Sequence, residues 1–137
     1  MNIQDNVKRQ LDLIRCYEHE YHRESNSVIL LAVSKKKTLT DIIEAYRSGI
    51  IHFGESYVQE AVTKIEAMQD KDAVWHFIGR VQKNKTREIA KHFSYVHSLS
   101  SLEHAKKLNE SIGSQVIGRL ILLAFWVPFL GPDCVAK

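Results

Sequence analysis

The sequence predicts an α/β protein with a parallel sheet, arranged as a (β/α) barrel. Apolar segments that start near residues 28, 50, 74 and 94 are each followed by a stretch with helical periodicity, which makes four βα units. The first segment, residues 28–33, is a continuous apolar run of the kind found in strands buried on both faces. The nearly even spacing favours a barrel over a doubly wound sheet, and no GxGxxG turn is present to decide between them.

Length and composition restrict this prediction further. The chain has 137 residues, whereas a complete (β/α)₈ barrel needs roughly 200 to 250. It is 45% hydrophobic and 26% charged, which is ordinary for a folded globular chain, and its formal charge of +3 is too small for a dedicated nucleic-acid binder. Cys16 and Cys134 have no metal or redox spacing. The polar amino terminus carries no export signal, so we expect a cytoplasmic protein that does not enter membranes.

The first half of the chain contains the clearest element signals. Apolar residues recur at helical spacing from residue 3 to about 21, and we expect a helix there, followed by a strand over residues 28–33. Thr40 is the expected cap of the next helix, and Gly49 stands where a left-handed residue ends it. A strand over residues 50–53 then leads through a turn at 54–56 into a helix whose core stripe is Val58, Ala61, Val62, Ile65 and Met68.

The second half repeats the pattern twice and then changes character. We expect strands at 74–78 and 94–97, helices at 86–92 and 102–109, and a capping box formed by Ser100 and Glu103. Residues 116–137 contain both prolines and an apolar run of 11 residues, too short to cross a membrane. We interpret residues 1–115 as one half-barrel domain and residues 116–137 as an apolar tail that has left the original reading frame. Comparison of the coding DNA in all three frames would test this.

Three lysines directly follow the first predicted strand, at the end of the sheet where barrels place their active sites. They are Lys35, Lys36 and Lys37. A partly desolvated lysine at a strand end can form a Schiff base with an aldehyde, although a lysine run in a loop is also a common solvated feature. The loops at 54–57 and 79–85 occupy the same place after the next two strands, and the three loops together could line one mouth.

Other groups in the sequence give weaker signals. His52, His76 and His97 lie on three different predicted strands without metal-ligand spacing, so we interpret them as satisfied or partly exposed strand histidines. The cluster from Lys83 to Arg87 could bind phosphate or RNA, but a solvated helix start is the simpler interpretation. The absence of a GxSxG elbow, a P-loop and paired carboxylates argues against hydrolases and NTPases.

Three segments in this order resemble the pyridoxal phosphate homeostasis proteins of the YggS/PROSC type, relatives of the alanine racemase amino-terminal barrel. They are residues 30–35 (LLAVSK), 52–60 (HFGESYVQE) and 75–85 (WHFIGRVQKNK), and the resemblance runs to about Glu110. Family members usually have Asn in place of Ser56 and His in place of Arg80. Their phosphate-binding residues lie in the carboxyl-terminal half of the barrel, which this sequence does not resemble after residue 115.

The resemblance implies a (β/α)₈ barrel that holds pyridoxal 5′-phosphate as a Schiff base on Lys35, with Val33, Ser56 and His76 as further cofactor contacts. It implies a protein that buffers the cofactor and delivers it to apo-enzymes that depend on it, without an established catalytic turnover and without a metal. A racemase-like enzyme needs a second proton-transfer residue that we cannot place, and an RNA-binding βα module is the third alternative. We expect the 137-residue chain alone to hold the cofactor weakly or not at all.

Overall fold

The sheet has four parallel strands in the order of the sequence. In the computed structural model, which describes residues 2–69 and 71–112, these are β1 (Leu31–Val33), β2 (His52–Glu55), β3 (Val74–Phe77) and β4 (Tyr95–Val96). Each strand pairs with the next one along the chain, as in a barrel, whereas a doubly wound sheet reverses its strand order. The expected parallel (β/α) architecture is confirmed for these four units.

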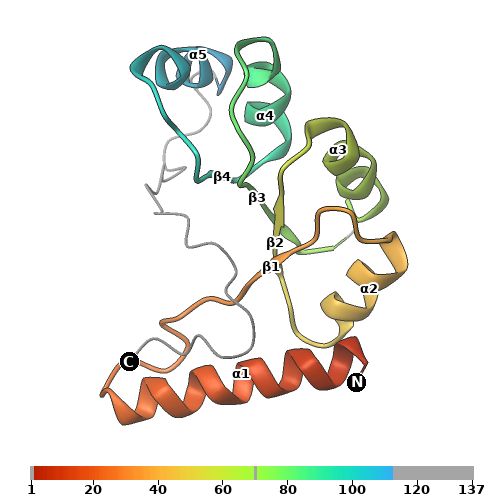
Figure 1. Cartoon of the computed structure of the whole chain (residues 1–137), viewed down its shortest axis with the longest axis vertical. Coiled ribbons are helices and arrows are strands. Elements are labelled where there is room, and N and C mark those ends of the chain that lie inside the picture. The colour runs from red at the N-terminus through yellow and green to blue at the C-terminus, as the bar shows by residue number, and fades with distance from the viewer. Residues whose placement is uncertain (1, 70, 113–137) are drawn as a thin grey trace.

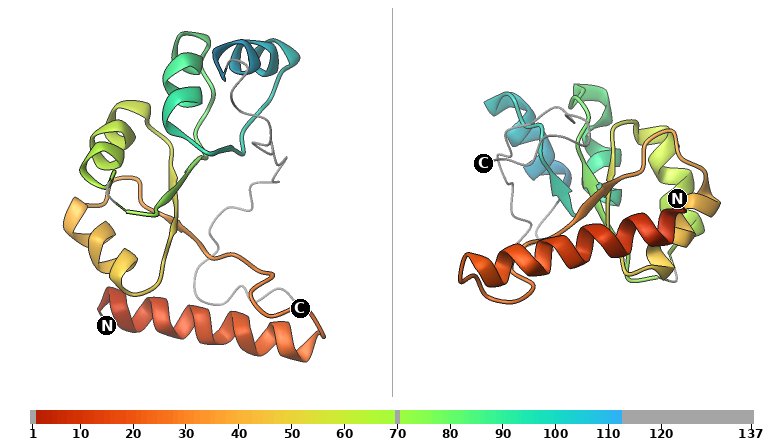
Figure 2. Two further views of the ribbon diagram at one scale, coloured as in Figure 1. Left: turned by 180° about the vertical axis from the view of Figure 1, so that it is seen from behind. Right: turned by 60° about the horizontal axis from the view of Figure 1, so that its bottom comes forward.

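Helices cover one side of this sheet. The helices are α1 (Ile3–Glu20), α2 (Leu39–Arg47), α3 (Val58–Ala67), α4 (Thr86–His92), preceded by a 3₁₀ turn (Lys83–Lys85), and α5 (Leu102–Ile112). Figure 1 shows α2 to α5 following one another around the outer side of the strands, with α1 lying across one end next to α2. The views in Figure 2 show the same arc from behind and from below. None of the helices in the described residues is long and apolar enough to cross a membrane.

The strand register divides the side chains between two faces. Phe53 pairs with Trp75, and Glu55 with Phe77, and all four of these residues are buried against the helices. The alternating positions form the concave face, where one rank across the strands reads Val33, Gly54, His76 and Tyr95. Because successive side chains of a strand point to opposite faces, the apolar core lies between sheet and helices.

The expectation for the first strand is wrong in length and in burial. β1 contains only three residues, Val33 is 49% exposed and Ile29 is 59% exposed. The polar groups of Val28 bind α1 instead of a neighbouring strand: its N–H donates to Glu18 Oε1 at 2.7 Å, and its carbonyl accepts from Arg15 Nη2 at 3.1 Å. The sequence run is apolar, but α1 holds its beginning away from the sheet.

The boundaries of α2 and β2 differ less from the expected ones than those of β1 do. Thr38, and not Thr40, caps α2, because its hydroxyl accepts the N–H of Asp41 while the Asp41 carboxylate accepts the N–H of Thr38. The N–H of Ile50 donates to the carbonyl of Ala45 near the end of α2 and not to a neighbouring strand, and β2 starts two residues later than expected and includes Gly54 and Glu55.

At the ends of two helices one expectation is wrong and the other is confirmed. Ser101 caps α5 by accepting the N–H of His104, which replaces the expected box of Ser100 and Glu103. Gly49 has φ +105°, which confirms the left-handed residue expected after α2. The apolar segment at 116–137 lies outside the described residues.

Candidate functional site

Lys35 lies at the carboxyl end of β1, where the sequence places it. The residue before it, Ser34, is buried: its N–H donates to the carbonyl of Gly54 at 2.9 Å, and its hydroxyl donates to Glu55 Oε1 at 2.6 Å. Ser34 therefore faces the helices. Alternation along β1 assigns Val33 to the concave face, and the half-buried Lys35 follows in a turn that the N–H of Lys37 closes by donating to the carbonyl of Ser34 at 3.1 Å.

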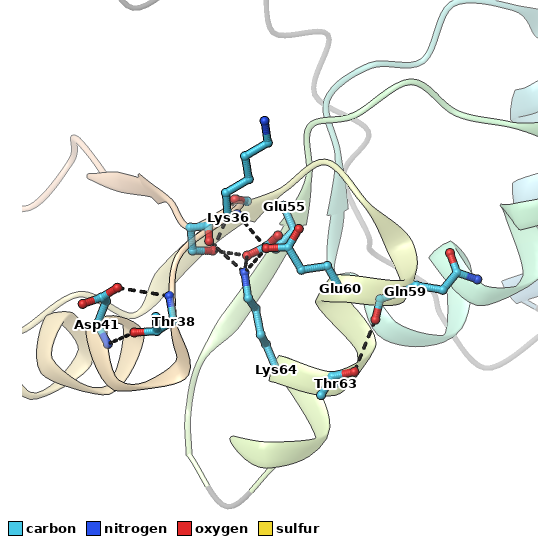
Figure 3. Close-up of polar contacts among 10 residues, drawn as sticks. Lys36, Thr38, Asp41, Glu55, Gln59, Glu60, Thr63 and Lys64 are labelled. Atoms are coloured by element: carbon cyan, nitrogen blue, oxygen red, sulfur yellow. Dashed lines mark hydrogen bonds and ion pairs between the residues drawn. The ribbon is translucent and has the colours of Figure 1, made fainter.

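A buried group of charges on α3 lies beneath this loop. Lys64 Nζ donates to Glu55 Oε1 at 2.8 Å, to Glu60 Oε1 at 2.6 Å and to the carbonyl of Ser34 at 2.8 Å (Figure 3). Burial opposes the charge of Lys64, but the hydrogen bonds that Lys64 donates to the two carboxylates outweigh it and raise the pKa of Lys64 above its ordinary value. The hydrogen bond from Lys64 lowers the pKa of Glu60, so the pair stays ionised near neutral pH.

Three histidines on the concave face bind one another in a row. His52 Nδ1 lies 2.9 Å from His76 Nε2, and His76 Nδ1 lies 2.8 Å from His97 Nε2, so each contact is a hydrogen bond between two rings. Tyr95 stacks on His76 with its ring centroid 4.5 Å away. The expectation of satisfied strand histidines is confirmed, and no group of residues in the described chain could hold a metal ion.

This histidine row, His52–His76–His97, holds one added proton at most without losing a contact. A neutral imidazole has one donor and one acceptor nitrogen, so all three neutral rings must share one tautomer. A single proton lets His76 donate to both neighbours, whereas protonated rings at both ends would require His76 to accept twice. Burial, and then the charges of His97 and His52, lower the pKa of His76 to about 4. Burial also lowers the pKa values of the two outer rings.

A cavity of about 360 Å³ lies where the loops after β2 and β3 meet. The two loops touch at Gly79, where a Cβ atom would lie 2.1 Å from the carbonyl oxygen of Ser56, so only glycine permits this approach. Arg80 and Lys85 give the cavity a basic side. Its complete lining is Ser56, Tyr57, Val58, Gln59, Phe77, Gly79, Arg80, Gln82 and Lys85. Two of the three loops expected at one mouth therefore meet, while the loop after β1 contributes none of the lining.

The predicted site residues fall into two places. Val33 and His76 share one rank of the concave face on either side of Gly54, and Lys35 follows at the end of β1. Ser56 lies at the cavity. The basic cluster starting at Lys83 forms a 3₁₀ turn and the start of α4, and Lys83 is paired with Glu103 at 2.8 Å.

Sequence reasoning missed the residues under the Lys35 loop. Glu55 was expected in a turn, and Lys64 and Glu60 fall between the apolar positions of the α3 stripe. The spacing of four residues that puts Glu60 and Lys64 on one helix face was the only available signal.

Comparison with known proteins gives a consistent result. No family model matches the chain. The pyridoxal phosphate homeostasis proteins of Vibrio alginolyticus and Haemophilus influenzae are 42% and 44% identical to it over 119 and 112 residues, which is 84% and 80% of this chain. The solved structure of PipY from Synechococcus elongatus with PLP bound is 38% identical with a TM-score of 0.61, over 69% of this chain and 45% of that one. A protein described as unknown from Bifidobacterium adolescentis is 29% identical with a TM-score of 0.69, over 79% of this chain and 48% of that one.

The matches cover most of this chain but only about half of each relative. The matches to the two curated proteins span 51% and 47% of those proteins, so the chain spans about half the length of the relatives it matches. Within that half, the fold agrees as well: the structure of PipY without PLP is 39% identical with a TM-score of 0.62 over 71% of this chain. Over about half of their length, the pyridoxal phosphate homeostasis proteins are therefore the proteins that this chain resembles in sequence and in fold.

Proposed function

We propose that this chain binds pyridoxal 5′-phosphate through Lys35 and takes part in intracellular homeostasis of that cofactor. The observation that carries the proposal is the position of Lys35 in the turn directly after β1, at the carboxyl end of the strand, within the motif at residues 30–35. The relative PipY has been solved with PLP bound. In the attachment, Nζ forms a C=N bond with the aldehyde carbon and the aldehyde oxygen leaves as water, so the bond is reversible.

The residues present fit the aldehyde and ring of the cofactor. Gly54 stands between Val33 and His76 in the same rank and has no side chain, which gives the Ile78 side chain room to pack over the strand there. The nearest atom to a Cβ built on Gly54 would be Ile78 Cδ1 at 3.1 Å, so a larger residue would be crowded there. Val33 and His76 are the proposed ring contacts, and Ser56 is the proposed polar contact at the loop after β2.

The proposal is a binding and carrier role. A held aldehyde cannot react with other amines, and release requires only water, which suits delivery to apo-enzymes that use this cofactor in the cytoplasm. The low pKa of His76 keeps this ring neutral near pH 7, so it contributes a dipole and a shape to the site instead of a charge. Residues 1–115 are proposed as the amino-terminal half of the barrel, and the phosphate contacts of the longer relatives as belonging to the other half.

Borohydride reduction tests this function because it converts the C=N bond into a stable amine. The full chain is incubated with pyridoxal phosphate, reduced and mapped by peptide mass spectrometry. We expect one pyridoxyl adduct on Lys35, absent in Lys35→Ala and retained in Lys36→Ala, which removes a neighbouring amine from the same loop. Adducts spread evenly over surface lysines in the folded chain would contradict the proposal.

A further inference from the structure

Side chains of α3 hold the peptide groups on both sides of Lys35. The carbonyl of Ser34, which belongs to the peptide group before Lys35, accepts a hydrogen bond from Lys64 Nζ at 2.8 Å. The N–H of Lys36, which belongs to the peptide group after Lys35, donates to Glu60 Oε1 at 2.6 Å. The torsions φ and ψ of Lys35 are the rotations between these two peptide groups. When both groups are fixed, the direction of the Cα–Cβ bond of Lys35 is fixed as well.

The charged side chains that fix these peptide groups are partly or fully buried, and burying a charge costs free energy. Glu55 is fully buried and accepts from Lys64 and from the Ser34 hydroxyl through Oε1, while its Oε2 is buried without a hydrogen-bond partner. A buried charge group contributes little net stability compared with apolar residues of similar volume, and an unpaired buried oxygen reduces that contribution further. Stability alone therefore does not account for this arrangement.

The neighbouring lysine has a different environment. Lys36 adopts a left-handed backbone with φ +61°, uncommon for a residue with a side chain, and its N–H is the one that Glu60 accepts. Figure 3 shows the Lys36 side chain extending away from the charges on α3. The two adjacent lysines therefore differ in environment. Lys36 is turned outward, and Lys35 lies between two fixed peptide groups.

From these contacts we infer that Lys64 and Glu60 are positioning residues that set the direction in which the Lys35 side chain leaves the backbone and so select its amine over those of Lys36 and Lys37 as the attachment point. This inference rests on the proposed function of Lys35. Neither residue touches the cofactor in this account. Lys64 and Glu60 act only through the backbone of the loop.

The test removes the charges without creating new unpaired groups. In the double variant Lys64→Met, Glu55→Leu, the Ser34 carbonyl keeps its bond from the N–H of Lys37, and the Ser34 hydroxyl keeps the carbonyl of Gly54 as its acceptor. We expect an unchanged urea midpoint but a roughly tenfold to hundredfold slower modification of Lys35, because α3 no longer donates a hydrogen bond to the Ser34 carbonyl and Glu60 loses the ammonium that holds its carboxylate in place. The trapped adducts should spread to Lys36 and Lys37.

A second variant and a control cover the case in which the double variant does not fold. Glu60→Ala changes a partly exposed residue, releases the N–H of Lys36 and removes one of the three acceptors of Lys64 Nζ, so it should fold and show the same spread with a smaller loss of rate. Thr63→Ala lies on the exposed face of the same helix, binds only the carbonyl of Gln59, and should behave like the wild type.

The results separate the two proposals. A wild-type chain without selective modification of Lys35 overturns the proposed function. A selective wild type, together with a folded double variant or Glu60→Ala variant that modifies Lys35 at the same rate and with the same selectivity, overturns only the positioning role.

Discussion

The two faces of the sheet use the same strands for different purposes. On the outer face, Phe53, Trp75 and Phe77 are at most 4% exposed beneath the helices. On the concave face the same strands carry the histidine row and Tyr95, and Val33 at the end of β1 is 49% exposed. The outer residues stabilise the fold, whereas the inner residues present polar and ionisable groups. Alternation along a strand allows each set to change without changing the other.

Replacement of one aromatic residue on the outer face should have the largest effect on stability. Phe53→Ala removes a side chain that is 1% exposed and packs on Trp75 with ring centroids 5.4 Å apart, so we expect a loss of about 3 to 5 kcal/mol in the free energy of unfolding. Val33→Ala on the concave face should cost less than about 1 kcal/mol, because that side chain is half exposed. Urea titrations of the two variants measure this difference, and equal losses would mean that both faces belong to one core.

This difference also explains how much of the fold the sequence could predict. The helical stripe on α3 and the helix from Thr86 to His92 were predicted correctly, because apolar spacing reports which side of an element faces the core. The same pattern failed at residues 28–30. Their apolar side chains fit a strand, but the hydrogen bonds of Val28 to Glu18 and Arg15 come from an element 10 to 13 residues away.

The concave face was predictable only in part. The motif around Lys35 could be read from the sequence, because its position after an apolar run places it at the end of a strand. The contacts between His52, His76 and His97 depend on the strand register, which no local pattern fixes across 45 residues. Lys64 and Glu55 are charged residues that are buried in pairs, and composition gives no sign of which charges will be buried.

The histidine row on the concave face should also make the stability of the fold depend on pH. Burial lowers the pKa of His76 from 6.5 to about 4, so between these values the unfolded chain binds a proton that the folded chain does not. Stability is therefore fully present above pH 6.5 and falls as the pH decreases towards 4. Between pH 7 and pH 5 we expect a loss of about 2 kcal/mol from this group.

Urea unfolding at the two pH values measures this loss, and His76→Gln is the matched control. Glutamine does not titrate, so this variant should lose less stability over the same interval than the wild type. The carboxylates with lowered pKa values titrate below pH 5 and add little in this range. An identical pH dependence in wild type and variant would mean that the histidine row is hydrated and not buried.

The smallest expected effect concerns the start of α2, in the outer layer, where the sequence offers two threonines, Thr38 and Thr40, as the helix cap. Thr38→Ala should cost about 1 kcal/mol, because its hydroxyl accepts the N–H of Asp41 and the Asp41 carboxylate accepts the N–H of Thr38. Thr40→Ala should change stability by only a few tenths of a kcal/mol, since Thr40 is an exposed residue inside the first turn.

The sequence contains the reason for this difference: an acid stands three residues after Thr38, whereas Ile43 stands three residues after Thr40. Thermal unfolding of the two variants decides between the caps. A larger loss in Thr40→Ala would move the start of the helix by two residues.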